Sequence, residues 1–171
     1  MHRLHAAPFV FVILVLMAAP QGFAAPAAGP FARMAGPWRG VGMITMAGGG
    51  QERLRCRANY DVADRGSQMR LNLRCASDSY TFDLAGDVAS DGRTISGSWS
   101  EASRNATGTV EGRVNGNQID VAARGEGFAA RLSLITRGNQ QSVAIRPQGT
   151  EVREVAITLI KGHPTTTGSA R

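Results

Sequence analysis

Apolar residues occupy every second position over most of this chain, and this pattern constrains the fold more than any other feature. Between residues 38 and 161 only short runs of turn-forming residues interrupt the alternation, and no helical period rises above it. A strand that alternates in this way buries one face and exposes the other. The sequence therefore predicts an all-β, antiparallel domain whose strands share one apolar core.

Two arginine-rich segments give the most detailed test of strand pairing. Apolar residues fall on even numbers in residues 53–62 and on odd numbers in residues 69–75. A turn at residues 65–66 then places every inward residue opposite another inward residue, as a shared buried face requires. In this register Cys56 lies opposite Cys75, close enough for a bridge. We predict a disulfide within this hairpin, which stabilises by about 3 kcal/mol in the chain-entropy model.

The same test predicts the downstream hairpins. Asp91 and Gly92 are typical of a two-residue type I′ turn, and further reversals are expected at residues 104–105, 115–117, 125–126 and 138–139. The predicted inward pairs are Leu84 with Trp99, Gly86 with Gly97, Val88 with Ile95, Trp99 with Val110, Ile95 with Val114, Val114 with Ile119, Ala123 with Phe128, and Leu134 with Val143.

The strands follow one another as a meander, which begins with residues 38–46 and ends with residues 152–161. A twisted meander with one apolar face tends to close, because closure removes its exposed edges. In the predicted register Gly86, Gly97 and Gly112 lie side by side on three strands, which suits a barrel corner. We therefore predict an up-and-down barrel of about 8–10 strands, with an open or two-layer sheet as the alternative.

The N-terminus has the layout of a secretory signal peptide. His2, Arg3 and His5 precede an apolar run at residues 9–19, which is shorter than the about 20 residues of a spanning helix. A retained membrane anchor is the alternative. We predict a signal peptide at 1–24, a flexible lead-in at 25–35, the barrel at 36–161 and a disordered tail at 162–171, and hence a periplasmic or secreted protein.

One short motif resembles a known family. Residues 36–40 are Gly-Pro-Trp-Arg-Gly, and a Gly-x-Trp at the first strand of a meander barrel resembles the opening motif of calycins, the lipocalin and avidin-like barrels. The resemblance implies that Trp38 closes the barrel floor and that the interior holds a small apolar ligand. The chain departs from the lipocalin pattern, because no helix follows the barrel and the inward set is rich in small residues.

Aromatic residues on the inward face are the candidates for contact with an interior ligand. Trp99, with Leu84, Phe82 and Val110 around it, forms the largest predicted cluster. The alternative is a packed core, which is the more common role of a buried tryptophan. The candidates are Trp38, Tyr60, Phe82, Trp99 and Phe128.

Five arginines alternate with the apolar set on the outer face of the disulfide hairpin. Arg57 is expected opposite Arg74, a like-charge pair that needs an anion or an acidic neighbour, and Asp61 opposite Arg70 offers partial relief. We interpret this set either as an anion-binding face or as solvated charge that discourages aggregation. Outward charge also argues against an outer-membrane barrel. The set is Arg53, Arg55, Arg57, Arg70 and Arg74.

Catalytic and metal chemistry have little support in the sequence. Beyond the predicted signal peptide the only histidine is His163, so no Ser-His-Asp or Cys-His arrangement has a base. A carboxylate pair from Glu101, Glu111 or Asp120 stays formally open, although the last two are expected to point outward. No cluster has metal-ligand spacing, and the glycine-rich runs are turns. We expect no enzyme activity, no metal and no cofactor.

These observations favour an exported barrel that binds a small apolar ligand inside or an anionic envelope lipid or polymer outside. The net charge of +6 falls by one when Arg3 is removed with the signal peptide, and a basic surface attracts anions. Nucleic acid is not expected as a partner of an exported protein. The alternative is a structural or protein-interaction barrel with a packed core, such as an inhibitor or an envelope-assembly factor.

Overall fold

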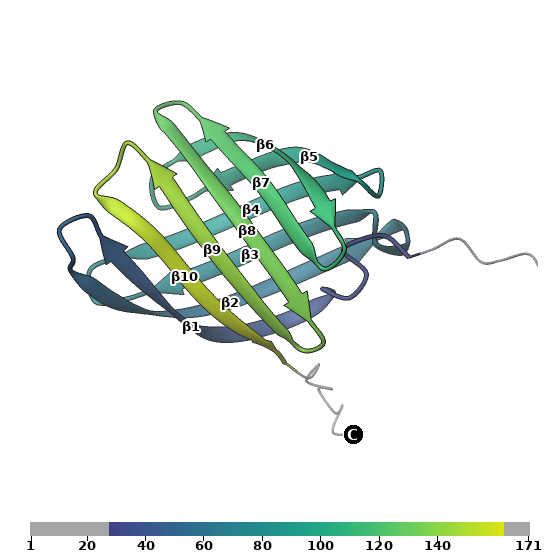
Figure 1. Cartoon of the computed structure of the whole chain (residues 1–171), viewed down its shortest axis with the longest axis horizontal. Helices are drawn as coiled ribbons and strands as arrows, with labels where there is room; N and C mark the ends of the chain where they lie inside the picture. The colour runs from purple at the N-terminus through teal and green to yellow at the C-terminus, as the bar shows by residue number, and fades with distance from the viewer. Residues whose placement is uncertain (1–27, 163–171) are drawn as a thin grey trace, which may run out of the picture.

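The computed structural model describes residues 28–162, which form a closed barrel of ten antiparallel strands. The strands are β1 (Gly36–Met46), β2 (Gln51–Ala63), β3 (Gln68–Ala76), β4 (Thr81–Ser90), β5 (Thr94–Glu101), β6 (Ala106–Asn115), β7 (Gln118–Gly125), β8 (Phe128–Arg137), β9 (Gln140–Gln148) and β10 (Val152–Lys161), with a 3₁₀ turn, η1 (Asp64–Gly66), after β2. Each strand pairs with its neighbours in sequence, and β1 also pairs with β10. Figure 1 shows β7 to β10 crossing in front of β2 to β5. The predicted up-and-down barrel is confirmed.

The hairpin of β2 and β3 has the predicted register. Cys56 lies opposite Cys75 with the two Cα atoms 4.1 Å apart, and the two residues form the disulfide. The turn between the strands depends on three successive positive φ angles, of which Gly66 has the largest, at 97°. The periodicity and the turn residues together were therefore sufficient to predict this pairing.

In three downstream hairpins the register differs from the predicted register by two residues. Leu84 pairs with Glu101, Trp99 pairs with Gly108, and Phe128 pairs with Gly125. A shift of two residues keeps each side chain on its predicted face, so the inward set is unchanged. The predicted pairs Val114 with Ile119 and Leu134 with Val143 are confirmed. The wrong pairs are Leu84 with Trp99, Gly86 with Gly97, Val88 with Ile95, Trp99 with Val110, Ile95 with Val114, and Ala123 with Phe128.

Side-chain hydrogen bonds and glycine conformation explain these shifts. The Asp91 carboxylate accepts hydrogen bonds from the backbone N–H groups of Arg93 and Thr94, which lengthens the predicted two-residue turn. In the β5–β6 loop, Glu101 accepts a hydrogen bond from the backbone N–H of Ser103, and the chain reverses earlier in the sequence than the predicted residues 104–105. In the β7–β8 loop Gly127, with φ 65°, takes the left-handed conformation, and the chain reverses at residues 126–127 instead of the predicted 125–126.

The predicted glycine row is wrong, because glycines alternate with large side chains across these strands. Gly86 and Gly108 lie on either side of Trp99, on β4 and β6. A Cβ atom on Gly108 would lie 2.7 Å from Nε1 of Trp99, and one on Gly125 would lie 2.9 Å from its ring carbon Cζ2. The glycines therefore make room for the indole of Trp99. Gly97 lies opposite Val88 and Val110, and Gly112 lies opposite Ile95 and Val121.

One end of the barrel, called the floor below, is closed by the residues before β1. Phe31 and Met34 are buried, and the N–H of Phe31 donates a hydrogen bond to the carbonyl oxygen of Gly66. Nε1 of Trp38 donates to the carbonyl oxygen of Met34 at 2.7 Å, and the ring of Trp38 meets that of Tyr60 edge-on. Residues 28–35, within the predicted lead-in, are thus folded against the barrel.

Several sequence predictions lie outside the described residues. These are the signal peptide at 1–24, the first residues of the lead-in and the tail from residue 163 onward. Within residues 28–162, no helix combines the length and apolar character needed to cross a membrane.

Candidate ligand-binding cavity

An apolar cavity of about 450 Å³ lies inside the barrel. It opens at the end opposite the floor, which is called the mouth below, because its lining includes Glu126 and Gly127 of the β7–β8 loop and Thr150 of the β9–β10 loop. Its volume lies in the usual range for small-molecule sites. The wall comes from nine of the ten strands, all except β1, with Leu54, Leu73, Leu84, Trp99, Ala123, Ala130, Leu132, Ile145 and Val155 among its apolar side chains.

Two pairs of aromatic rings line the wall near the mouth. Tyr80 and Phe82 stack with their ring centroids 6.4 Å apart, and Trp99 meets Phe128 edge-on at 5.2 Å. Nε1 of Trp99 donates a hydrogen bond to the carbonyl oxygen of Arg124, which fixes the indole. Because the polar atom of Trp99 is already bonded, its ring presents an apolar surface to the cavity.

Small inward residues leave this space empty. Ala123 of β7 lies opposite Ala130 of β8, and both are buried residues of the cavity wall. Ten strands also enclose a wider interior than the about eight strands that side chains alone can fill. The cavity therefore has two structural causes, which are the number of strands in the barrel and the small alanine side chains of β7 and β8.

A fixed polar group lies at the mouth. Glu101 is 7% exposed, and its carboxylate accepts hydrogen bonds from the backbone N–H groups of Asp83 at 2.9 Å and Ser103 at 3.0 Å. Its second oxygen accepts one from Nη1 of Arg104 at 3.3 Å. Burial raises the pKa of Glu101, but these hydrogen bonds outweigh burial and hold the pKa below its usual value. Glu101 is thus an ionised anchor for the loop.

Arg104 extends the polar mouth over the aromatic wall. Its guanidinium lies 5.0 Å from the centroid of the Phe82 ring, where a cation is attracted to the ring face. The Arg104 side chain is 51% exposed, so it retains donors that face solvent and the cavity opening. The cavity is therefore apolar inside and charged at its edge.

A second buried polar group belongs to the floor. The Tyr60 hydroxyl donates a hydrogen bond to Oε1 of Gln141 at 2.5 Å, and Nε2 of Gln141 donates to Oγ1 of Thr136. Burial raises the pKa of Tyr60, and the hydrogen bond to Gln141 offsets only part of this effect. All the polar atoms of this group are satisfied, as a closed barrel end requires.

The five aromatic candidates separate into two groups. Phe82, Trp99 and Phe128 line the cavity, whereas Trp38 and Tyr60 lie in the floor. Sequence analysis did not identify Tyr80, Glu101 or Arg104 as residues of the mouth. Glu101 did carry a signal, since it continues the inward alternation of Ile95, Gly97 and Trp99. Arg104 lies in a loop, where alternation gives no information.

The outer arginines also separate into two groups. All five lie on the exposed side of β2 and β3, with Arg57 opposite Arg74 as predicted. Arg70 pairs with Asp87 at 3.2 Å and Arg74 pairs with Asp83, both carboxylates coming from β4. The acidic relief therefore comes mainly from β4, while Arg53, Arg55 and Arg57 form no ion pair within residues 28–162.

The carboxylates that sequence analysis left open do not converge. Glu111 lies 3.6 Å from Arg124 on the outer surface, and Asp120 accepts hydrogen bonds from Gln118. In the described part of the chain, no three His, Cys, Asp or Glu side chains are grouped closely enough to hold a metal ion.

Comparison with known proteins identifies the fold. No protein-family model matches the sequence, and no curated protein matches it. The solved structure of Rv2717c from M. tuberculosis matches with a TM-score of 0.62 at 12% identity, over 77% of this chain and 94% of that one. The S-type phycobiliprotein lyase CPES from Guillardia theta matches with a TM-score of 0.57 at 12% identity, over 78% and 90%. The likeness shows a calycin-like barrel fold.

Proposed function

We propose that this protein is an exported, non-enzymatic barrel that binds one small, mostly apolar ligand in its interior. The observation that carries the proposal is the cavity of about 450 Å³, apolar along its wall, closed at the floor and open at the mouth. An apolar ligand of matching size would gain packing contacts with this lining. A concave apolar site with a few polar groups at one end is the usual form of a ligand site.

The lining favours a ligand with an apolar body and a polar end. The body would contact Phe82, Trp99 and Phe128, and the polar end would lie at the mouth beside Arg104. Arg104 is held by Glu101 and the Phe82 ring but keeps free donors, so it can bind a carboxylate or another acceptor. An amphiphile that enters apolar end first fits this arrangement.

Export is part of the proposal. The Cys56–Cys75 disulfide is typical of an oxidising compartment, and the N-terminal sequence has the layout of a signal peptide. A packed structural barrel, the competing hypothesis, is opposed by the open interior.

A fluorescence titration with the neutral apolar dye N-phenyl-1-naphthylamine tests the proposal. We expect saturable binding of one dye per barrel and quenching of Trp99, which lines the cavity. Trp38, the other tryptophan, lies in the floor and should be quenched less. The W99F and W38F variants separate the two signals.

A matched pair of variants places the dye. Ala130 is buried in the cavity wall, whereas its neighbour Ala129 points to the outer face of the same strand. A130L should fill part of the cavity and abolish dye binding, and A129L should bind as the wild type does. Equal binding by both variants, or the absence of saturable binding to the wild type, would contradict an interior site.

A further inference from the structure

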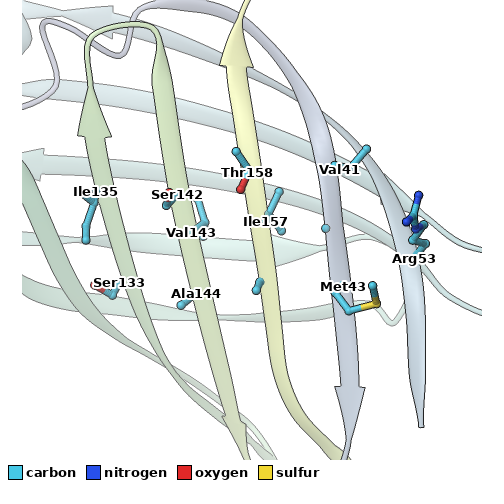
Figure 2. A pocket seen from close by; sticks show the side chains of 12 residues that line it. Val41, Met43, Arg53, Ser133, Ile135, Ser142, Val143, Ala144, Ile157 and Thr158 are labelled. Carbon is cyan, nitrogen blue, oxygen red and sulfur yellow. The ribbon is translucent and has the colours of Figure 1, made fainter.

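The outer face of β8, β9, β10 and β1 carries an apolar trough that is separate from the interior cavity. Its volume is about 490 Å³. Figure 2 shows Val41 and Met43 of β1 on one side and Ile135 of β8 on the other, with β9 and β10 between them. The outward side chains between these walls are small, which leaves the trough open: Ser142, Ala144, Ala156 and Thr158.

Exposed aliphatic side chains border this trough. Val41 is 59% exposed and Ile160 is 52% exposed, and they are the exposed large hydrophobic residues of the described chain. Ile160 of β10 lies opposite Arg39 of β1, and Val41 lies opposite Thr158, so both belong to one continuous face. Contiguous exposed apolar surface marks an interaction site with a protein or a membrane.

Four arginines follow the edge of the same face. Arg53, Arg55 and Arg57 of β2 lie opposite Met43, Val41 and Arg39 of β1 in turn. The ion pairs formed by residues 28–162 include none of these four, whereas Arg70 and Arg74 are paired with aspartates. Arg39 directly opposite Arg57 is a like-charge pair. This edge therefore carries positive charge that the barrel itself leaves unbalanced.

We propose that the outer face of β2, β1 and β10 docks on an anionic lipid surface. Lipid headgroups supply the phosphates that the guanidinium groups bind, and the interfacial region beneath them accepts Val41 and Ile160. A free anion would leave these aliphatic side chains in water. A second copy across a two-fold axis would bring two arginine edges together, because such an interface uses the same patch twice.

Flotation with lipid vesicles tests this surface on the mature protein. Vesicles of equal parts phosphatidylglycerol and phosphatidylcholine should bind the protein, and vesicles of phosphatidylcholine alone should not. Each arginine near an anionic surface contributes about fivefold to binding, so R55Q/R57Q should weaken it about 30-fold. V41S/I160S should weaken it about tenfold through lost apolar contact. Binding should fall as salt shortens the Debye length from about 30 Å to about 8 Å.

A charge-matched variant serves as the control. Arg93 and Arg113 lie at the opposite side of the barrel, in the β4–β5 loop and on β6, so R93Q/R113Q removes the same charge elsewhere. It should bind vesicles as tightly as the wild type. Three results would each overturn the proposal. The two arginine variants could weaken vesicle binding equally, or the wild type could bind neutral and anionic vesicles equally well. The wild type could also fail to bind vesicles and instead form a dimer that V41S/I160S disrupts. Dye binding in the cavity should be unchanged by all these variants, which separates this test from that of the proposed function.

Discussion

Trp99 shows how a single residue and the glycines around it determine the shape of the interior. Its indole occupies space that Gly108 and Gly125 leave free, and its Nε1 is bonded to the backbone of β7. A bulky residue beside glycines on both neighbouring strands packs without displacing the backbone. The glycines of β6 and β7 therefore make room for the Trp99 ring, which in turn lines the cavity.

Gly108→Ala tests this packing. The added Cβ would lie 2.7 Å from Nε1 of Trp99 and 1.9 Å from the carbonyl oxygen of Arg124, so the indole or a strand must move. We expect a loss of about 1–3 kcal/mol in the free energy of unfolding, measured by urea denaturation. Ser100→Ala, at an exposed position of β5, is the control and should change little. Equal stability of G108A and the wild type would show that the site is not tightly packed.

Glu101→Gln tests the anchor at the mouth. The pKa of Glu101 is lowered in the folded state from its ordinary value of 4.5, so the ionised carboxylate adds stability above that value, and this stability is lost as pH falls through the lower folded pKa. At neutral pH we expect E101Q to be about 1–3 kcal/mol less stable, and the difference should shrink in acid below pH 4.5. Glu126→Gln, at an exposed position of the mouth, is the control. A difference between wild type and E101Q that is constant with pH would contradict this role.

At the scale of strands, the alternation of apolar residues determines which side chains face inward, and the turns determine the register between paired strands. The β2–β3 register could be predicted because the cysteines and glycine constrained one turn. The β4–β5 register could not, because the Asp91 carboxylate lengthens the turn through hydrogen bonds that alternation does not encode. A register shift of two residues leaves each side chain on the same face of the sheet, so an error of this size in the predicted register does not change the fold class.

The floor is an element that alternation could not reveal. Phe31 and Met34 precede the first strand and carry no period-two signal, yet both are buried, and the carbonyl oxygen of Met34 accepts the hydrogen bond from Trp38. Phe31→Ala should lower the free energy of unfolding by about 3–5 kcal/mol, because Phe31 is 1% exposed. Chemical denaturation followed by tryptophan fluorescence measures the loss, with the exposed Arg33→Ala as control. If both variants unfold alike, residues 28–35 do not stabilise the barrel.

At the scale of the whole molecule, the alternation of apolar residues predicts which side of the sheet a side chain faces, but not how far along the barrel axis that side chain lies. Phe82, Trp99 and Phe128 lie at the height of the cavity, whereas Trp38 and Tyr60 lie at the floor. The empty volume depends on the number of strands in the ring and on the strand registers, so no local pattern could predict it. The candidate ligand site was thus only partly predictable from inward aromatic residues.

Native mass spectrometry of the protein purified from its own cells, and again after incubation with a lipid extract of those cells, tests the central claim most directly. An interior site predicts one bound small molecule per chain in the wild type and none in A130L. A wild-type mass that equals the polypeptide alone in both preparations would contradict the claim that the barrel is a ligand carrier.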